Sequence, residues 1–482
     1  MIQNFDTTGL LAPQKAHAQF IAESLIKNGF AWDGSGTGTG KTYSASAVIR
    51  HLNQDFCIIC PKLVIPVWES VLSSFGLKAK FLVNYEKICR GNTKWLKYRK
   101  QKKTKLKVES TGKVKVILEP EMDCIKLKIP AHYLIVLDES HKCRGVNSLQ
   151  SGMMMACKRQ GYKTLMLSAT QATSPLDMRA FGMVTELHNG EMKKYKEFCI
   201  EAGAEWVGKW GALTFDGEEA KAKEKMLTIH NDLFNVRKVG SRLSRRDFGD
   251  IFPSLEIVAE AYDMGVNSDK IQQAYDEMEY ELDLLEEKTA NYKDHILAVI
   301  TRMRRKVEML KVPTMVEMAK DLYEENKSVL MFVNYTDTIE SIYERLSGEF
   351  NPELIGRLFG GQTNKQKLDD VAAFQRDDKR FMVANLAAGG QSISLHDLNG
   401  NHPRSSLINP SFSAINVLQS MGRHDRAHAK TDCYTRFVYS AKCHVEENVC
   451  RRFQLKKDNI ELLNDGDLTP ERLFHFAGGL DL

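Results

Sequence analysis

A glycine-rich stretch near the amino terminus has the residue types needed to hold phosphate groups. Residues 34–42 read GSGTGTGKT. Glycine lets successive backbone N–H groups turn toward an anion, a following lysine can reach the β- and γ-phosphates, and the threonine after it can bind Mg²⁺. The strict phosphate-loop pattern places glycine at the position of Ser35. The residues expected to bind the phosphates are Gly36, Gly38, Gly40, Lys41 and Thr42.

Two further clusters supply the other groups that phosphoryl transfer needs. Asp138 and Glu139 follow the apolar run YLIVL at 133–137, so one carboxylate can serve Mg²⁺ and the other the attacking water. Arg423 and Arg426 are three residues apart in QSMGRHDRA. On a helix this spacing is one turn, so both guanidinium groups can face one phosphate and neutralise its developing charge. Together the clusters predict an enzyme that hydrolyses ATP with Mg²⁺.

The elements that must position these residues are strands alternating with helices. Near-continuous apolar runs occur in both halves of the chain, as FCIIC, AKFLV, YLIVL and TLMLS in the first and SVLMFV, RFMVAN and SSLIN in the second. Such runs are typical of parallel sheets covered on both faces. With 482 residues, the chain exceeds what one core supports. We therefore expect an α/β fold with a first lobe at 1–235, a helical connector at 236–325 and a second lobe at 326–482.

The connector contains long charged helices. Its Leu, Ile and Met residues recur at three- and four-residue steps over limited stretches only, which favours helices packed on the lobes over a coiled-coil surface for a protein partner. The second reading stays open.

Composition is that of a soluble globular protein, with 43% hydrophobic and 27% charged residues and a formal net charge of +5. The sequence has neither a membrane-length apolar run nor the layout of a secretory signal, so we expect a cytosolic or nuclear protein. The ten cysteines are then reduced thiols. Cys57 and Cys60 have C-x-x-C spacing, but they lie in an apolar strand-like run without a second such pair nearby, which favours buried cysteines over a metal site.

Residues 94–107, KWLKYRKQKKTKLK, carry eight Lys or Arg and no acid, with two aromatic residues interleaved. A solvated loop, a nuclear-import signal and a nucleic-acid contact are all compatible with this composition. If the segment contacts nucleic acid, the candidate contact residues are Lys97, Arg99, Lys102 and Lys103.

Taken together, the motifs resemble those of superfamily-2 helicases and translocases, in the same order along the chain. SGTGTGKT is similar to motif I, where Ser is usual at the first position, LDESH to a DEAH-like motif II and LSAT to motif III. VLMFVNY is similar to motif IV, VANLAAGGQSISL to motif V and QSMGRHDR to motif VI. Within the superfamily, CPKLVIPVW, NYEKI and HKCRGVNS look most like segments of Swi/Snf-type DNA translocases. The resemblance covers roughly residues 10 to 455.

This resemblance implies two RecA-like lobes with ATP in the cleft between them, and a glutamine upstream of motif I, here Gln14, that reads adenine. Residues implied to couple the phosphate site to nucleic acid are His141, Ser168, Thr170 and Gln419. Residues in motifs that line the nucleic-acid track are Lys62, Asn84, Tyr85, Asn334, Gly389 and Gly390. Such motifs contact mostly backbone, so little sequence specificity is expected.

The chain departs from the Swi/Snf pattern at SATQATSP after motif III, at Gly422, and in about twenty extra residues within 90–130. The compact length favours a viral or phage-type member, which would act in host cytoplasm. We expect a monomeric ATPase motor that translocates on or remodels duplex or branched DNA. Two alternatives remain. One is a strand-separating DNA or RNA helicase, which needs a wedge such as a hairpin in the inserted segment, and the other is an ATP-driven remodeller of a protein–nucleic acid complex.

Overall fold

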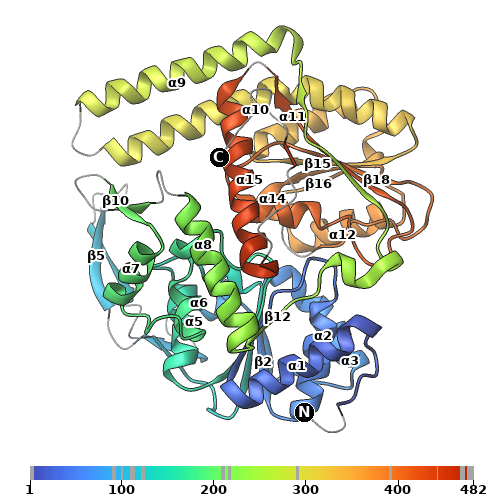
Figure 1. The fold of residues 1–482 in the computed structure, drawn as a ribbon. Coiled ribbons are helices and arrows are strands. Elements are labelled where there is room, and N and C mark those ends of the chain that lie inside the picture. Colours follow the sequence, from blue (N-terminus) through green and yellow to red (C-terminus); the bar gives the residue numbers. More distant parts are fainter. Residues whose placement is uncertain are drawn as a thin grey trace. The chain divides into compact units, whose positions relative to one another are not determined.

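The structure, a computed structural model, describes residues 5–89, 94–98, 101–108, 114–120, 125–207, 212–214, 219–288, 292–389, 393–441, 443–466 and 473–474. The chain forms two compact units (Figure 1). Unit 1 comprises Met1–Asp247 and Asp458–Pro470, and unit 2 comprises Phe248–Lys457 and Glu471–Leu482. The boundaries expected from sequence, at 235 and 325, differ from this grouping, because the connector beyond Asp247 clusters with unit 2.

Unit 1 contains a parallel six-stranded sheet with the order β12-β1-β9-β8-β2-β3. Its strands are β1 (Phe30–Asp33), β2 (Phe56–Cys60), β3 (Phe81–Asn84), β8 (Leu134–Asp138), β9 (Lys163–Leu167) and β12 (Gly240–Ser241). Four of them match the apolar runs of the first half, as the near-continuous hydrophobicity of a doubly covered sheet predicts.

Alternate residues of these strands point into two separate cores. Ile58 and Val136 belong to the core under α1 (Ala12–Asn28), α2 (Lys41–Leu52) and α3 (Ile65–Ser74). Ile59 and Leu137 belong to the opposite core, under α5 (Leu149–Arg159), α6 (Arg179–Val184), α7 (Met192–Glu201) and α8 (Glu219–His230). Figure 1 shows α1, α2 and α3 together on one side of unit 1 and α5 and α6 on the other. Because helices cover both faces of the sheet, a ligand can reach it only at the strand ends, and ligands of such sheets bind at the carboxyl ends.

The inserted segment forms two antiparallel strand pairs. The short strands β4 (Leu96–Tyr98) and β7 (Ile125–Leu127) pair with each other, and β5 (Gln101–Val108) pairs with β6 (Val114–Pro120) along seven register positions. The segment between NYEKI (residues 84–88) and motif II therefore carries a β-hairpin on a two-stranded base. Outside the inserted segment, β10 (Glu205–Val207) and β11 (Ala212–Thr214) form a further antiparallel pair.

Unit 2 contains a second parallel six-stranded sheet, with the order β13-β19-β18-β15-β17-β16. Its strands are β13 (Leu255–Val258), β15 (Ser328–Val333), β16 (Ile355–Leu358), β17 (Phe381–Asn385), β18 (Arg404–Ile408) and β19 (Cys433–Phe437), beside the short pair β14 (Ala261–Tyr262) and β20 (Tyr439–Ser440). The two parallel sheets confirm the expected α/β class.

The helices of unit 2 are α9 (Ser268–Lys288), α10 (Tyr292–Glu324), α11 (Thr336–Ser347), α12 (Asn364–Gln375), α13 (Leu386–Gly389), α14 (Ala414–Met421) and the first part of α15 (His444–Asp465). Figure 1 shows α10 and α11 on one side of the sheet and α12 on the other. Val312, Met315 and Ala319 of α10 are buried in the core with β15, and Lys306 of α10 pairs with Glu277 of α9. Within unit 2, the long connector helices thus pack on the sheet.

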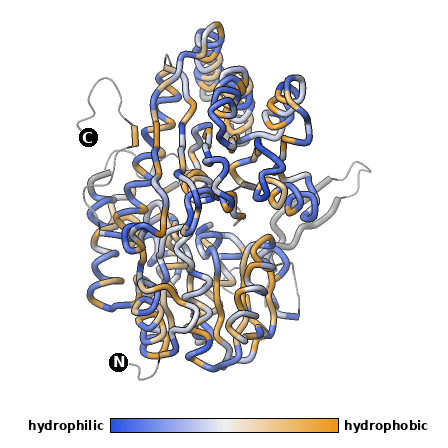
Figure 2. Tube along the Cα trace, turned by 90° about the vertical axis from the view of Figure 1, so that its right-hand side faces the viewer, coloured by the Kyte–Doolittle hydropathy of each residue, from blue (hydrophilic) through white to orange (hydrophobic). Residues whose placement is uncertain are grey.

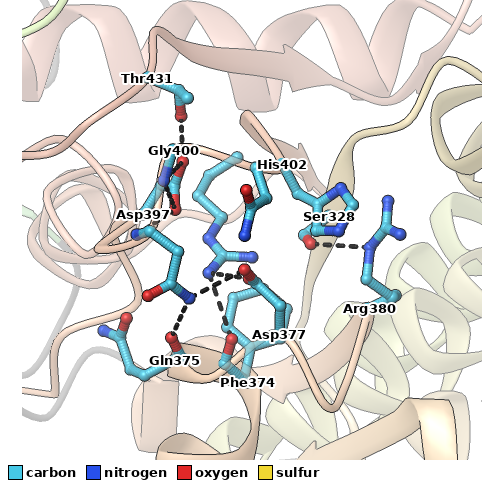
Figure 3. A network of polar contacts seen from close by, with 12 residues as sticks. Ser328, Phe374, Gln375, Asp377, Arg380, Asp397, Gly400, His402 and Thr431 are labelled. Carbon is cyan, nitrogen blue, oxygen red and sulfur yellow. Dashed lines mark hydrogen bonds and ion pairs between the residues drawn. The ribbon is translucent and has the colours of Figure 1, made fainter.

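A polar network closes the amino-terminal edge of the second sheet (Figure 3). Asp377 accepts hydrogen bonds from Arg404 and Asn399 at 2.9 and 2.8 Å, and Asp397 accepts from Gly400 N and Thr431 Oγ1. The fully buried Arg404 opens β18 here. This edge is the end of the sheet opposite to the strand carboxyl ends.

Within the described part of the chain, no helix has both the length and the apolar character required to cross a membrane. Figure 2 shows hydrophilic and hydrophobic residues interspersed along the trace.

Candidate functional site

The glycine-rich loop lies between the carboxyl end of β1 and the amino terminus of α2. Gly38 and Gly40 have φ values of 77° and 83°, the left-handed region in which a side chain is strained. Lys41 Nζ donates hydrogen bonds to the carbonyls of Ser35 and Gly36, both at 2.8 Å. The loop thus presents α2's first N–H groups and a lysine ammonium at one place, as an anion site requires.

Ser35 binds the loop to a segment far away in sequence. Its backbone N–H donates to Asp33 Oδ1 at 2.9 Å, and its hydroxyl accepts from Leu243 N at 2.9 Å. The backbone N–H of Gly36 donates to Leu243 O at 2.8 Å. The residue that departs from the strict phosphate-loop pattern therefore satisfies a buried N–H that glycine would leave unpaired.

A buried contact between His17 and Asp33 supports the start of this loop. His17 Nε2 lies 3.2 Å from Asp33 Oδ2, and His17 Nδ1 lies 2.7 Å from Ser241 Oγ. Burial acts to raise the pKa of Asp33, but His17 and Lys41 outweigh it, so the pKa is lowered. For Lys41, burial lowers the pKa, although Glu139, Asp33 and Asp138 act to raise it.

Gln14, the proposed adenine reader, is buried against the loop. Its Nε2 donates to Thr39 O at 2.8 Å, and its Oε1 accepts from Leu11 N at 2.8 Å. A Cβ built on Gly40 would lie only 2.3 Å from Gln14 Nε2. In this structure the Gln14 amide supports the loop backbone.

The carboxylates of motif II stand at the end of β8. Asp138 Oδ2 accepts a hydrogen bond from Trp68 Nε1 at 2.9 Å, and its carbonyl accepts from the Tyr85 hydroxyl at 2.8 Å. Burial and then the neighbouring Glu139 raise the pKa of Asp138 to about 7, against the opposing effects of Trp68 and Lys41. Hydroxyl and carboxylate oxygens, such as those of Thr42 and Asp138, are ligands that suit Mg²⁺.

Glu139 has a φ of 53°, an uncommon conformation that is found preferentially at functional sites. Its carboxylate lies 3.3 Å from His141 Nδ1. The same ring nitrogen lies 3.1 Å from Ser168 Oγ, and this hydroxyl accepts from Thr170 N. The coupling candidates of unit 1 thus form one chain of contacts from motif II to motif III, because β8 and β9 are adjacent strands.

The arginines of motif VI lie outside a helix. Helix α14 ends at Met421, so the argument from one helical turn is wrong, and Gly422 begins a turn instead. Both side chains nevertheless converge, since Arg423 Nη1 and Arg426 Nη2 donate to Ile393 O at 3.4 and 3.1 Å. Between them, His424 is buried and anchors the turn, its Nε2 lying 3.3 Å from Thr435 Oγ1.

The other motif VI candidate, Gln419, is buried on α14.

The nucleic-acid candidates of unit 1 differ in exposure. Lys62 is exposed at the start of the segment after β2. Asn84 Nδ2 donates to Glu86 Oε2 at 2.6 Å. Tyr85 is fully buried, so its side chain supports Asp138 rather than offering a surface to a ligand.

In unit 2, Asn334 follows β15 and donates to a carboxylate of α10, Glu308, at 2.7 Å. Gly389 is the last residue of α13, whereas Gly390 lies outside the described residues.

Only part of the basic segment is described. Lys97 is exposed on β4, and Trp95 packs against Phe81 with ring centroids 5.5 Å apart. Trp95 therefore belongs partly to the core. Lys102 and Lys103 lie on β5, and Arg99 lies outside the described residues.

Cys57 and Cys60 point to opposite faces of the first sheet, since they belong to its two different cores. They cannot share one ion. Among all described residues, no group of three or more His, Cys, Asp or Glu side chains could hold a metal by itself.

The sequence reasoning missed Trp68 as a partner of Asp138, and Leu243 and His17 as supports of the loop. Trp68 stood in a recognised motif, CPKLVIPVW. Leu243 is about two hundred residues from the loop and contacts it only through its backbone N–H and carbonyl. Every residue except proline has these two groups, so the residue type at position 243 does not indicate the contact.

No protein-family model matches the chain. The chain is 33% identical over 480 residues to "Putative ATP-dependent RNA helicase L364" of Acanthamoeba polyphaga mimivirus, with 97% of this chain and 86% of that protein aligned. Among solved structures, it is similar to "Sulfolobus solfataricus SWI2/SNF2 ATPase core in complex with dsDNA", at 15% identity and a TM-score of 0.37, covering 91% of this chain and 90% of that one.

Proposed function

The chain belongs to the superfamily-2 helicases and translocases, a family of ATP-hydrolysing enzymes, and from this premise we propose that it is a motor driven by nucleic-acid-dependent ATP hydrolysis. One observation carries the proposal: Lys41, Asp138 and Glu139 lie together where the first sheet ends, Lys41 after β1 and the two carboxylates at the end of β8, so that both carboxylates act to raise the pKa of Lys41 and Glu139 acts to raise the pKa of Asp138. This is the arrangement that phosphoryl transfer to water needs.

Each residue would have a separate task. Lys41 would bind the β- and γ-phosphates of ATP, and Glu139 would orient the attacking water. Thr42 and Asp138 would hold Mg²⁺, which supplies charge neutralisation on the phosphates when bound. In unit 2, Arg423 and Arg426 would stabilise the charge that develops on the transferred phosphoryl group.

The hairpin β5–β6 favours strand separation as the output of this motor. Separation needs an element that divides the two strands, and the inserted segment folds as a hairpin of this kind. Its first strand, Gln101–Val108, has four lysines and no acid, a composition that favours contact with a phosphate backbone. The mimivirus relative is named an RNA helicase, which supports the same candidate and leaves RNA and DNA both to be tested.

A second candidate output is translocation on duplex DNA without strand separation. It is supported by the stretches CPKLVIPVW, NYEKI and HKCRGVNS, which look like Swi/Snf-type translocases.

The first experiment compares ATP hydrolysis with duplex DNA, single-stranded DNA and RNA, for the full chain and for Lys41→Ala. We expect at least tenfold stimulation by one of these nucleic acids and loss of turnover in the variant. A lack of stimulation by all three would contradict the proposed motor, and turnover that survives in Lys41→Ala would contradict the site.

The second experiment separates the two outputs. Because Tyr98 and Ile125 are paired neighbours, a two-residue Asn-Gly turn can replace residues 99–124 and close the base sheet. Strand displacement should disappear in this variant while stimulated ATP hydrolysis persists. If the intact protein displaces a triplex strand but separates no duplex, translocation is the output and the wedge assignment is wrong.

A further inference from the structure

The carboxylate of Glu308 lies at the centre of a buried polar cluster in unit 2. Glu308 is on the connector helix α10 and is 1% exposed. Its Oε1 accepts hydrogen bonds from Tyr335 N at 3.0 Å and from Thr338 Oγ1 at 2.8 Å. Its Oε2 accepts from Asn334 Nδ2 at 2.7 Å and from Asn409 Nδ2, and Asn334 N lies 3.0 Å from both oxygens. Five donors from four residues therefore meet one carboxylate.

The partners of Glu308 come from the ends of neighbouring strands. Asn334 follows β15, and Asn409 follows β18, its neighbour in the sheet. Asn385, the last residue of β17 on the other side of β15, donates from Nδ2 to Asn334 O at 2.6 Å. Three adjacent parallel strands thus end in asparagine, and one carboxylate from α10 holds two of these residues directly and the third through Asn334.

The same carboxylate stabilises the start of α11. This helix begins after Tyr335, whose side chain makes no capping hydrogen bond. A tyrosine is a poor cap, and negative charge at a helix amino terminus is stabilising. Glu308, about 27 residues earlier in the chain, supplies both the acceptor and the charge.

Every hydrogen bond to Glu308 from the described residues comes from a donor, so the position requires a group that only accepts. Glutamine has nearly the same shape but would direct an NH₂ group toward N–H donors. Buried donors left without an acceptor are costly, and the loops that carry them would move.

We propose that Glu308 is a positioning residue for nucleic-acid binding: it fixes the ends of β15, β17 and β18, the edge of unit 2 that would contact the nucleic-acid backbone. This inference rests on the proposed motor function and deepens it, since ligands of parallel α/β sheets bind at the carboxyl ends of strands. The connector helix α10 then helps to position the residues that bind nucleic acid, in addition to connecting two parts of the chain.

The decisive comparison is Glu308→Gln against Glu317→Gln, the same substitution on an exposed part of α10, where the Glu317 side chain is 65% exposed. ATP hydrolysis is measured without nucleic acid and over a range of concentrations of the best stimulating nucleic acid. For Glu308→Gln we expect the concentration giving half-maximal stimulation to rise about tenfold, equivalent to 1.4 kcal/mol, with basal turnover within twofold of wild type. Equal half-maximal concentrations for the two variants would overturn the inference.

Two further variants exclude a general loss of folding. Thr338→Val removes one donor and leaves the carboxylate, so a smaller rise of the half-maximal concentration is expected. Glu308→Asp keeps an acceptor-only group and should restore part of the binding. A parallel fall of basal turnover, thermal midpoint and binding in all variants would instead assign Glu308 a structural role alone and contradict the inference.

Amide hydrogen exchange tests the cluster without any nucleic acid. Exchange in the peptide that contains Asn334 and Tyr335 should be faster in Glu308→Gln than in Glu317→Gln. If exchange is faster in Glu308→Gln but the wild type binds no nucleic acid, the Glu308 hydrogen bonds are supported. The proposed motor, and with it the role of Glu308 in nucleic-acid binding, would then be rejected. Unchanged exchange would reject the Glu308 cluster even if the wild type is a motor.

Discussion

The Ser35 hydroxyl accepts a hydrogen bond from the backbone N–H of Leu243 at 2.9 Å. This bond joins the phosphate loop to the stretch that leads to Asp247, the last residue of unit 1 before the chain enters unit 2. The departure from the strict loop pattern is therefore a structural contact between the loop and the segment that leaves unit 1.

Restoring the strict pattern should destabilise the protein. In Ser35→Gly and Ser35→Ala, the buried Leu243 N–H loses its acceptor, at a cost of about 1–2 kcal/mol. Ser35→Thr keeps a hydroxyl and serves as the control. Chemical unfolding measures the difference, and a Ser35→Gly variant as stable as wild type would show that the bond contributes nothing.

The glycines of the loop should differ in their tolerance of a side chain. Gly40 has a positive φ, and an added Cβ would collide with Gln14, so Gly40→Ala should lose about 2 kcal/mol or more of stability. An added Cβ at Gly36 meets only Thr39 Cγ2 at 3.5 Å and Leu243 O at 3.7 Å. Gly36→Ala should therefore stay within about 0.5 kcal/mol of wild type in thermal unfolding. Equal losses in the two variants would contradict the loop geometry.

The pH dependence of ATP hydrolysis should depend on Trp68. The pKa of Asp138 is raised to about 7, and the hydrogen bond from Trp68 opposes this rise. Only the ionised carboxylate binds Mg²⁺ well, so activity should increase as the pH rises through 7. Trp68→Phe removes the opposing donor, so the pKa rises further and the midpoint of the pH–activity curve moves to higher pH. Trp206, which is 50% exposed, gives the control Trp206→Phe, whose midpoint should stay unchanged.

Acid should destabilise the protein through its buried histidines. Burial lowers the pKa of His424 from 6.5 to about 4, so between these values the unfolded chain binds a proton that the folded chain does not. Stability therefore falls as the pH drops from 6.5 to 4, by up to about 3 kcal/mol for this group. His424→Gln should reduce the slope of the thermal midpoint against pH, whereas His444→Gln, at a 94% exposed side chain, should not. His188 and His396 have pKa values lowered in the same direction, so part of the slope remains.

The sequence by itself determined the α/β class and the ATP-binding motifs. The apolar runs FCIIC, YLIVL, SVLMFV, RFMVAN and SSLIN each precede candidate site residues. Their bounds agree within one or two residues with those of β2, β8, β15, β17 and β18, because a strand covered on both faces must be apolar along its whole length. For the same reason, the residue after such a run falls at a sheet edge, which placed Asp138 next to Lys41.

Tertiary structure decided the contacts between segments that are distant in the chain. The acceptor of the Leu243 N–H, the donor to Asp138 and the carboxylate that holds Asn334 lie in other elements, and each depends on register and packing rather than on local pattern. The convergence of Arg423 and Arg426 shows the same point, since it arises from a turn after α14 and not from helical spacing. Sequence fixes which residues can do the chemistry, and long-range hydrogen bonds between buried groups decide how they are held.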